Sequence, residues 1–315
     1  MLNRRHIRLK IMQYLYASEI SGFEDTKEHY KNLTESIHSV HNLFLLQISL
    51  LIEILKKATH TYNISNTRLN LKANEVYANK KFSENEFLKQ ISSSPRILEL
   101  IGSKSLINWQ IDYKYVNIIY DKIIKSEVYF SYLKENKNSF EVDIKFICYV
   151  FKELIITDEN FNSFIEEKNI FWTDDYPLVN TLTLKLLRNL KNNNLERLFY
   201  FKLFSNDSDK KYKDDLANLC LKNFESNNTY INKYLTNWDI DRLAKIDMVI
   251  INLAMTELTN FKEIPIKVTL NEFIEISKDY STSKSSFFIN GILDKIVKEL
   301  QKNNSLIKEG RGLKE

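Results

Sequence analysis

Glycine and proline are scarce in this chain of 315 residues, which has five of the first and three of the second. The tight turns that join neighbouring strands depend on these residue types, so the shortage argues against a sheet of many strands. Leucine, isoleucine, lysine and glutamate are abundant instead. We therefore expect an all-α protein.

Cysteine and long apolar runs are scarce as well. Cys148 and Cys220 each have apolar neighbours, which predicts buried thiols in a reducing compartment and excludes a disulfide scaffold. The longest apolar run, 43–55, is interrupted by polar residues and is shorter than a membrane-spanning helix. Arg8 and Lys10 stand where the apolar centre of a secretory signal would lie. We expect a cytoplasmic protein.

The net charge is only +4, so any preference for nucleic acid has to come from a local patch. The first helix offers one, because a helical period sorts its residues into two sides. The apolar side comprises Ile7, Ile11, Tyr14 and Leu15. The other side comprises Arg5, Gln13 and Tyr16, with Arg4 in or just before the first turn and Arg8 on the border. Guanidinium groups beside an aromatic ring suit phosphates and unstacked bases, although basic surface helices also occur for solubility alone.

The last third of the chain has the clearest helical pattern. The charged stretch 204–213, rich in Ser, Asn and Asp, predicts a break between two helical units. Apolar residues recur at threes and fours over 241–258 and again toward Leu300, which predicts two amphipathic helices. Between them, Thr269 and Glu272 have the spacing of a capping box, which predicts a helix start at Thr269.

Residues 239–300 resemble the C-terminal half of the transcription antitermination factor NusB. The segments that carry the resemblance, in the order and spacing of the family, are Arg242-Leu243 with Asp247, Ile250–Leu258, Ile264–Glu272 and Phe288–Lys295. The first helix, ending in 13–16, is similar to the arginine-rich first helix of the family. The resemblance implies a NusB-like helical bundle in four parts: 1–21 as its first helix, 22–205 as an additional helical insertion, 206–303 as its remainder and 304–315 as a flexible tail.

The resemblance also implies a function without catalysis and without a cofactor. NusB proteins bind boxA, a short single-stranded RNA element, and pair with NusE, a small-subunit ribosomal protein, in the RNA polymerase antitermination complex that acts on ribosomal RNA. By position, the resemblance assigns RNA binding to Arg4, Arg5, Arg8, Gln13, Tyr16, Lys284 and Phe288. It assigns partner binding to Tyr16 and Asp247. Three positions depart from the family pattern, namely His6 for a frequent Arg, Lys284 for a frequent acid and Phe287 for a typical basic residue.

Other functions have less support in the sequence. No phosphate loop, nucleophile elbow or segment for a methyl donor is visible, which argues against an enzyme and against an RNA methyltransferase that uses a NusB-like module. His38 and His41 with Glu35 share a helix face but lack a further ligand, so we expect no metal site. The mid-helix pair 290–291, Asn-Gly, is interpreted as a packing feature. A helical scaffold that binds acidic proteins rather than RNA stays open as an alternative.

Overall fold

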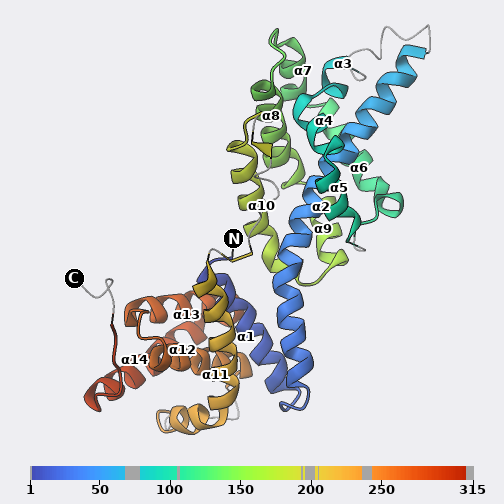
Figure 1. The fold of residues 1–315 in the computed structure, drawn as a ribbon. Helices are drawn as coiled ribbons and strands as arrows, with labels where there is room; N and C mark the ends of the chain where they lie inside the picture. The colour runs from blue at the N-terminus through green and yellow to red at the C-terminus, as the bar shows by residue number, and fades with distance from the viewer. Residues whose placement is uncertain are drawn as a thin grey trace. The chain divides into compact units, whose positions relative to one another are not determined.

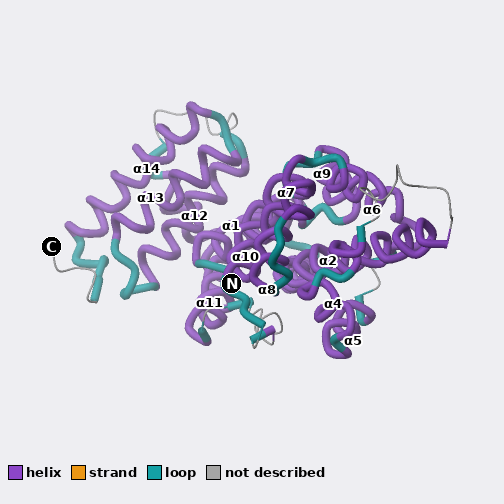
Figure 2. Tube along the Cα trace, turned by 90° about the horizontal axis from the view of Figure 1, so that it is seen from above, coloured by secondary structure: helices purple, strands orange, loops and turns teal. Residues whose placement is uncertain are grey.

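The computed structural model describes residues 2–67, 79–104, 107–192, 194–195, 203–204, 206–235 and 243–309. In this part of the chain nearly all regular structure is helical, and Figures 1 and 2 show helices joined by loops. Its regular elements include no β-strand, only one isolated parallel bridge between Leu2 and Phe204. The all-α fold expected from the sequence is confirmed.

The chain forms two compact units. The first unit comprises Met1–Ser36 and Phe204–Glu315, and the second comprises Ile37–Leu203. The second unit lies within the stretch 22–205 described above as an insertion. Both ends of the chain therefore meet in one unit, and a helix near residue 10 packs against helices more than 200 residues later.

The first unit surrounds a single buried helix. Every residue of α12 from Val249 to Leu258 is buried, because four other helices pack around it. A helix that is enclosed on all sides can be apolar around most of its circumference. The helices of this unit are α1 (Arg4–Ile20), the first turns of α2 (Thr26–Thr67), α11 (Asp207–Asn232), α12 (Lys245–Asn260), α13 (Ile266–Tyr280) and α14 (Ser283–Lys302).

Side-chain caps set the starts of three of these helices, α1, α11 and α14. The Asn3 side chain accepts a hydrogen bond from the backbone N–H of His6 at the start of α1, and Thr282 accepts one from Ser285 at the start of α14. Asn206 caps α11 in the same way. The predicted break over 204–213 is therefore wrong from Asp207 onward, because Asp207 and Asp209 lie in the first turn of α11, where they complement the helix dipole.

The second unit has the long helix α2 at its centre. Apolar side chains of α2 from Val40 to Ala58 are buried, and neutral polar side chains are buried with them. The other elements are α3 (Lys80–Ser83), α4 (Glu86–Ser93), α5 (Pro95–Gly102), α6 (Trp109–Ile124), α7 (Glu127–Lys134), α8 (Phe140–Tyr149), the π-helix η1 (Val150–Ile155), α9 (Glu159–Lys168) and α10 (Trp172–Arg188).

Helix α2 is long and apolar enough over Thr26–Ser65 to cross a membrane by length and composition, which the short run 43–55 did not predict. However, 78% of its most apolar stretch is buried inside the protein. Such burial is typical of a core helix, because the apolar face is already covered by other helices of its own chain.

The described part of the C-terminal segment does not behave as the free tail expected from residue 304. The Lys308 ammonium donates to the backbone oxygen of Phe261 at 2.9 Å, and the Glu309 N–H donates to that of Lys262 at 2.9 Å. These bonds hold residues 305–309 against the connection between α12 and α13. Residues 310–315 lie outside the described residues.

Candidate nucleic-acid interface

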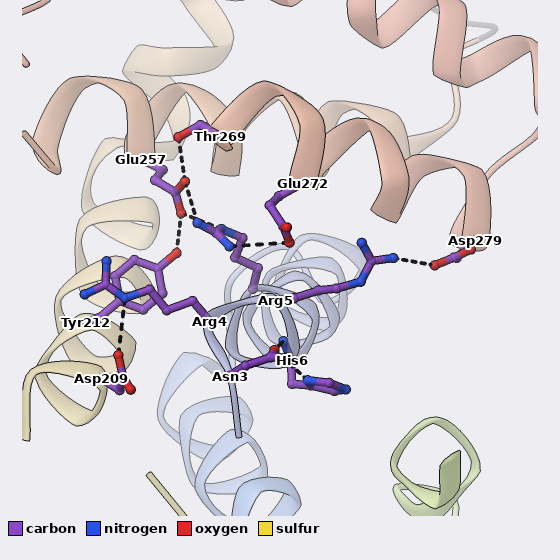
Figure 3. A network of polar contacts seen from close by, with 11 residues as sticks. Asn3, Arg4, Arg5, His6, Asp209, Tyr212, Glu257, Thr269, Glu272 and Asp279 are labelled. Atoms are coloured by element: carbon purple, nitrogen blue, oxygen red, sulfur yellow. Dashed lines mark hydrogen bonds and ion pairs between the residues drawn. The ribbon is translucent and has the colours of Figure 1, made fainter. Parts of the chain in front are cut away.

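A buried ion pair joins α1 to α12. The guanidinium of Arg8 donates to both carboxylate oxygens of Glu257, from Nε at 2.7 Å and from Nη2 at 3.0 Å. Tyr212 of α11 donates its hydroxyl to Glu257, and Thr269 of α13 donates to it at 2.7 Å. Figure 3 shows Glu257, Tyr212 and Thr269 converging from three helices. This cluster, Arg8–Tyr212–Glu257–Thr269, ties four helices together.

Neighbouring side chains stabilise the buried charges of this cluster. Arg8 is 2% exposed, and its guanidinium lies 5.7 Å from the ring centre of Tyr212 and 5.8 Å from that of Phe273. Burial opposes the charge of Arg8, but the hydrogen bond and the negative charge of Glu257 outweigh it and raise the pKa of Arg8. Burial and the same carboxylate raise the pKa of Tyr212 well above its ordinary value.

The prediction that Arg8 lies at the border of an exposed strip is wrong. Its donors are used inside the protein, so it positions α1 instead of facing a ligand. The capping box predicted at Thr269 is also wrong, because α13 begins at Ile266 after Pro265 and the hydroxyl of Thr269 bonds to Glu257. The sequence predicted Arg8 and Thr269 from short-range patterns. In the structure both side chains bond to Glu257, which lies on another helix.

Arg4 and Arg5 are more exposed than Arg8. The Arg4 side chain is 31% exposed, lies 3.2 Å from Asp209 through Nε, and stands over the ring of Tyr212 at 4.9 Å. The Arg5 side chain is 37% exposed and lies 3.1 Å from Asp279, whose side chain is 58% exposed. Arg5–Asp279 is a surface pair, which contributes little to stability and exchanges readily with other anions, whereas the Asp209 partner of Arg4 is buried. The Arg5 guanidinium therefore stays accessible at the start of α1, whereas that of Arg4 is partly covered by Asp209 and Tyr212 (Figure 3).

The Arg5–Asp279 pair brings the start of α1 beside the end of α13. The next helix, α14, starts three residues after Tyr280, and its second residue, Lys284, is exposed. Arg5 is therefore paired with a residue that precedes Lys284 by five positions in the chain.

His6 directly follows Arg4 and Arg5 and does not add to their charge at neutral pH. Burial, together with the positive charges of Arg5 and Lys10, lowers the pKa of His6 from 6.5 to about 4. The side-chain oxygen of Asn3 lies 2.7 Å from the His6 Nδ1 and accepts a hydrogen bond from it. His6 is therefore a neutral residue next to the basic start of α1.

The remaining predicted residues divide into exposed and buried ones. Tyr16 is 38% exposed on α1, and Gln13 is half-buried on the same helix. Phe288 is 8% exposed, so its ring lies mostly in the core, while its neighbour Phe287 is 81% exposed. The resemblance assigns RNA binding to Phe288, the more buried of these two rings, and names Phe287 only as a departure from a basic residue.

Two further expectations for this region are wrong. Asp247, assigned to a protein partner, is 3% exposed and accepts a hydrogen bond from the hydroxyl of Ser281 at 2.5 Å, so it joins the start of α12 to the end of α13. Asn290 and Gly291 are exposed, and a Cβ added to Gly291 would meet nothing within 4 Å. The glycine is therefore not required by helix packing.

The described residues hold no group of three or more His, Cys, Asp or Glu side chains that could bind a metal ion. His41 instead stacks against Phe44, with ring centres 6.3 Å apart. Of the two cysteines, Cys220 is buried and Cys148 is half-buried, and burial raises the pKa of Cys148 to about 11. Neither thiol has the low pKa of a reactive cysteine.

Comparisons with known proteins single out one family. The model of the NusB family matches residues 179–298, from within α10 into α14. The transcription antitermination protein NusB of Salinibacter ruber is 40% identical over 119 residues, which are 38% of this chain and 74% of that protein. No solved structure matches the chain.

Two other relatives carry the same name. The transcription antitermination protein NusB of Alkaliphilus oremlandii is 33% identical over 127 residues, covering 39% of this chain and 92% of that protein. The one of Chloroherpeton thalassium is 41% identical over 109 residues, covering 34% of this chain and 52% of that protein. Helix α1 lies outside the residues that the family model matches, so it is tertiary packing that adds α1 to this domain.

Proposed function

The chain belongs to the NusB family of transcription antitermination proteins, and on that premise we propose that it binds boxA-like single-stranded RNA during ribosomal RNA transcription. We further propose a NusE-type small-subunit ribosomal protein as its partner, within the antitermination complex of RNA polymerase. Its relatives are named for antitermination, and we assign it binding rather than catalysis.

One observation carries the proposal. The Arg5–Asp279 pair holds the basic start of α1 against the end of α13, close in the chain to the exposed Lys284 of α14. The exposed guanidinium of Arg5 is thus held at the end of α13, and the exposed Lys284 follows Asp279 by five residues. Such a region gains affinity for RNA by neutralising its phosphates. A single basic helix would be weaker support, because it could equally serve solubility.

The proposed contacts follow the exposure of each side chain. Arg4, Arg5 and Lys284 contact phosphates, Gln13 offers an amide to a base or sugar, and Tyr16 offers an aromatic face to a base or to the protein partner. Arg8, Asp247 and Phe288 are buried, so we assign them to the support of this surface rather than to contact.

The direct test is RNA binding by the full chain, measured by fluorescence anisotropy with a boxA-like RNA and with a scrambled RNA of the same composition. We expect the boxA-like RNA to bind more tightly, and we expect a NusE-type protein to increase the difference. Equal affinities for the two RNAs with the partner present would refute the proposal.

The scaffold alternative makes a different prediction for the same measurement. A scaffold would bind its protein partner equally well in the presence and absence of RNA, whereas RNA and partner should strengthen each other here. We place the protein in the cytoplasm, in keeping with the burial of α2.

A further inference from the structure

The outer face of α14 carries a row of lysines. Lys284, Lys295, Lys298 and Lys302 are exposed, and at 3.6 residues per turn they fall within about 60° of the helix circumference. In the part of the chain that the structure describes, no ion pair links any of these four ammonium groups to a carboxylate. The row, which we call the α14 lysine row, therefore presents positive charge that the fold does not use.

An exposed aromatic ring stands beside this row. Phe287 is 81% exposed, the highest value of any large apolar side chain among the described residues. It lies three residues after Lys284, on the adjoining edge of the same face. A ring in water gains nothing for the fold, because its apolar surface is not buried.

A bare stretch of backbone completes the arrangement. Gly291 lies within the row between Lys284 and Lys295, one turn after Phe287, and an added Cβ would meet no atom within 4 Å. Alanine would favour the helix more than glycine at this position. The fold therefore has no need of a glycine here, while a ligand that approaches the helix backbone would have one.

We propose that the α14 lysine row, Phe287 and Gly291 form an extension of the RNA path beyond boxA. The lysines contact successive phosphates, a base stacks on Phe287, and the sugar-phosphate chain crosses the helix over Gly291. This inference rests on the proposed function, and it adds a subsite for single-stranded RNA that flanks the boxA-like element.

The composition of this face favours RNA over an acidic protein. A protein interface needs an apolar centre of several side chains, whereas Phe287 is one ring among polar neighbours that include Asn290 and Asp294. Single-stranded nucleic acid needs only cations along its backbone and an aromatic face for a base.

The test compares a short boxA-like RNA with the same RNA extended by uridines at either end. The wild-type chain should bind one extended RNA more tightly than the short one. The double variant Lys295→Ala/Lys298→Ala should lose that gain and lower the salt dependence by about 0.7 per lysine. Lys210→Ala/Lys222→Ala, which removes two exposed lysines of α11, should leave the gain unchanged.

Two further variants test the ring and the glycine. Phe287→Ala should weaken binding of the extended RNA about ten-fold, and Phe287→Trp should retain it, because stacking needs a ring. Ile170→Ala, at a position 79% exposed, is the matched loss of an apolar side chain and should have no effect. Gly291→Ala should raise the melting temperature of the protein and still weaken its binding of the extended RNA.

The outcomes separate this inference from the proposed function. If the wild type prefers boxA-like over scrambled RNA but the α14 variants bind the extended RNA normally, the subsite is refuted and the proposed function stands. If the variants lose only a protein partner, with RNA affinity intact, the face is a protein surface and the inference is wrong. A wild type without preference for boxA-like RNA refutes the proposed function itself.

Discussion

Helices α1 and α2 follow one another in the chain, and both bury polar side chains, but of different kinds. On α1 the buried polar groups include two cations, Arg8 and Lys10, and Arg8 is paired with the fully buried Glu257. On α2 the buried groups are neutral. The amide of Gln47 donates to Asn180 at 2.5 Å and accepts from Thr183 at 2.7 Å, and the hydroxyl of Ser49 accepts from Trp109 at 2.9 Å.

The difference concerns how strictly each helix is oriented. A neutral amide or hydroxyl can find several partners, whereas a buried guanidinium without its carboxylate is very costly. Arg8 therefore fixes the orientation of α1 about its own axis, because only one orientation directs the Arg8 side chain toward Glu257. That same orientation leaves Arg4 and Arg5 partly exposed, so the buried charge and the proposed RNA-binding surface depend on each other.

Removal of the buried cation should have the largest effect. Arg8→Ala leaves the buried Glu257 without its cation, with only the hydroxyls of Tyr212 and Thr269 as donors, and we expect a loss of about 3–5 kcal/mol in the free energy of unfolding of the first unit. Hydrogen exchange of the α1 and α12 amides would measure it. Arg5→Ala is the matched control and should cost less than about 1 kcal/mol. Equal losses in the two variants would remove the distinction between buried and exposed arginines.

Removal of the neutral network of α2 should cost less. Gln47→Leu leaves Asn180 and Thr183 without a partner, and we expect the second unit to lose about 1–3 kcal/mol in urea unfolding. Lys56→Ala, at an exposed position of the same helix, should stay within about 0.5 kcal/mol of the wild type. RNA affinity should not change in either variant, and a change would contradict the assignment of RNA binding to the first unit.

Substitution of the exposed Arg5 should affect RNA binding more than folding. Arg5→Ala should weaken the binding of boxA-like RNA several-fold. It should also lower the slope of log affinity against log salt concentration by about 0.7, since one phosphate contact is lost. Arg5→Lys should keep the salt dependence, because the positive charge remains. Titration of RNA at several salt concentrations measures both effects. An unchanged salt dependence in Arg5→Ala would exclude Arg5 from the surface.

The effect that is smallest at neutral pH concerns His6, because it appears only as the pH falls. Burial and nearby cations lower the pKa of His6 to about 4, against about 6.5 in an unfolded chain. Between these two values the unfolded chain binds a proton that the folded one does not, so stability should fall as pH falls. His6→Gln should flatten the stability of the first unit against pH in this window, and an unaltered curve would show that His6 is not the titrating group.

The fold class and the family could be predicted from the sequence because both depend on local patterns. The period of apolar residues, the scarcity of glycine and proline and the segments of 239–300 appear in neighbouring residues, and the all-α fold follows from them. The site was predicted less well. The same period that placed Ile7 and Ile11 in the core placed Arg8 at the border, because a helical period cannot tell a border position from a buried ion pair.

What local chemistry dictated is where helices form and which of their faces are apolar, since propensity, capping and periodicity act within a few residues. Only the tertiary structure decided which polar side chains are buried and which partners they bond to. Arg8, Thr269 and Asp247 became internal because Glu257 and Ser281 reach them from elsewhere in the chain, and Phe287 became external because no neighbour covers it. Such pairings join residues far apart in sequence, so no short-range pattern contains them.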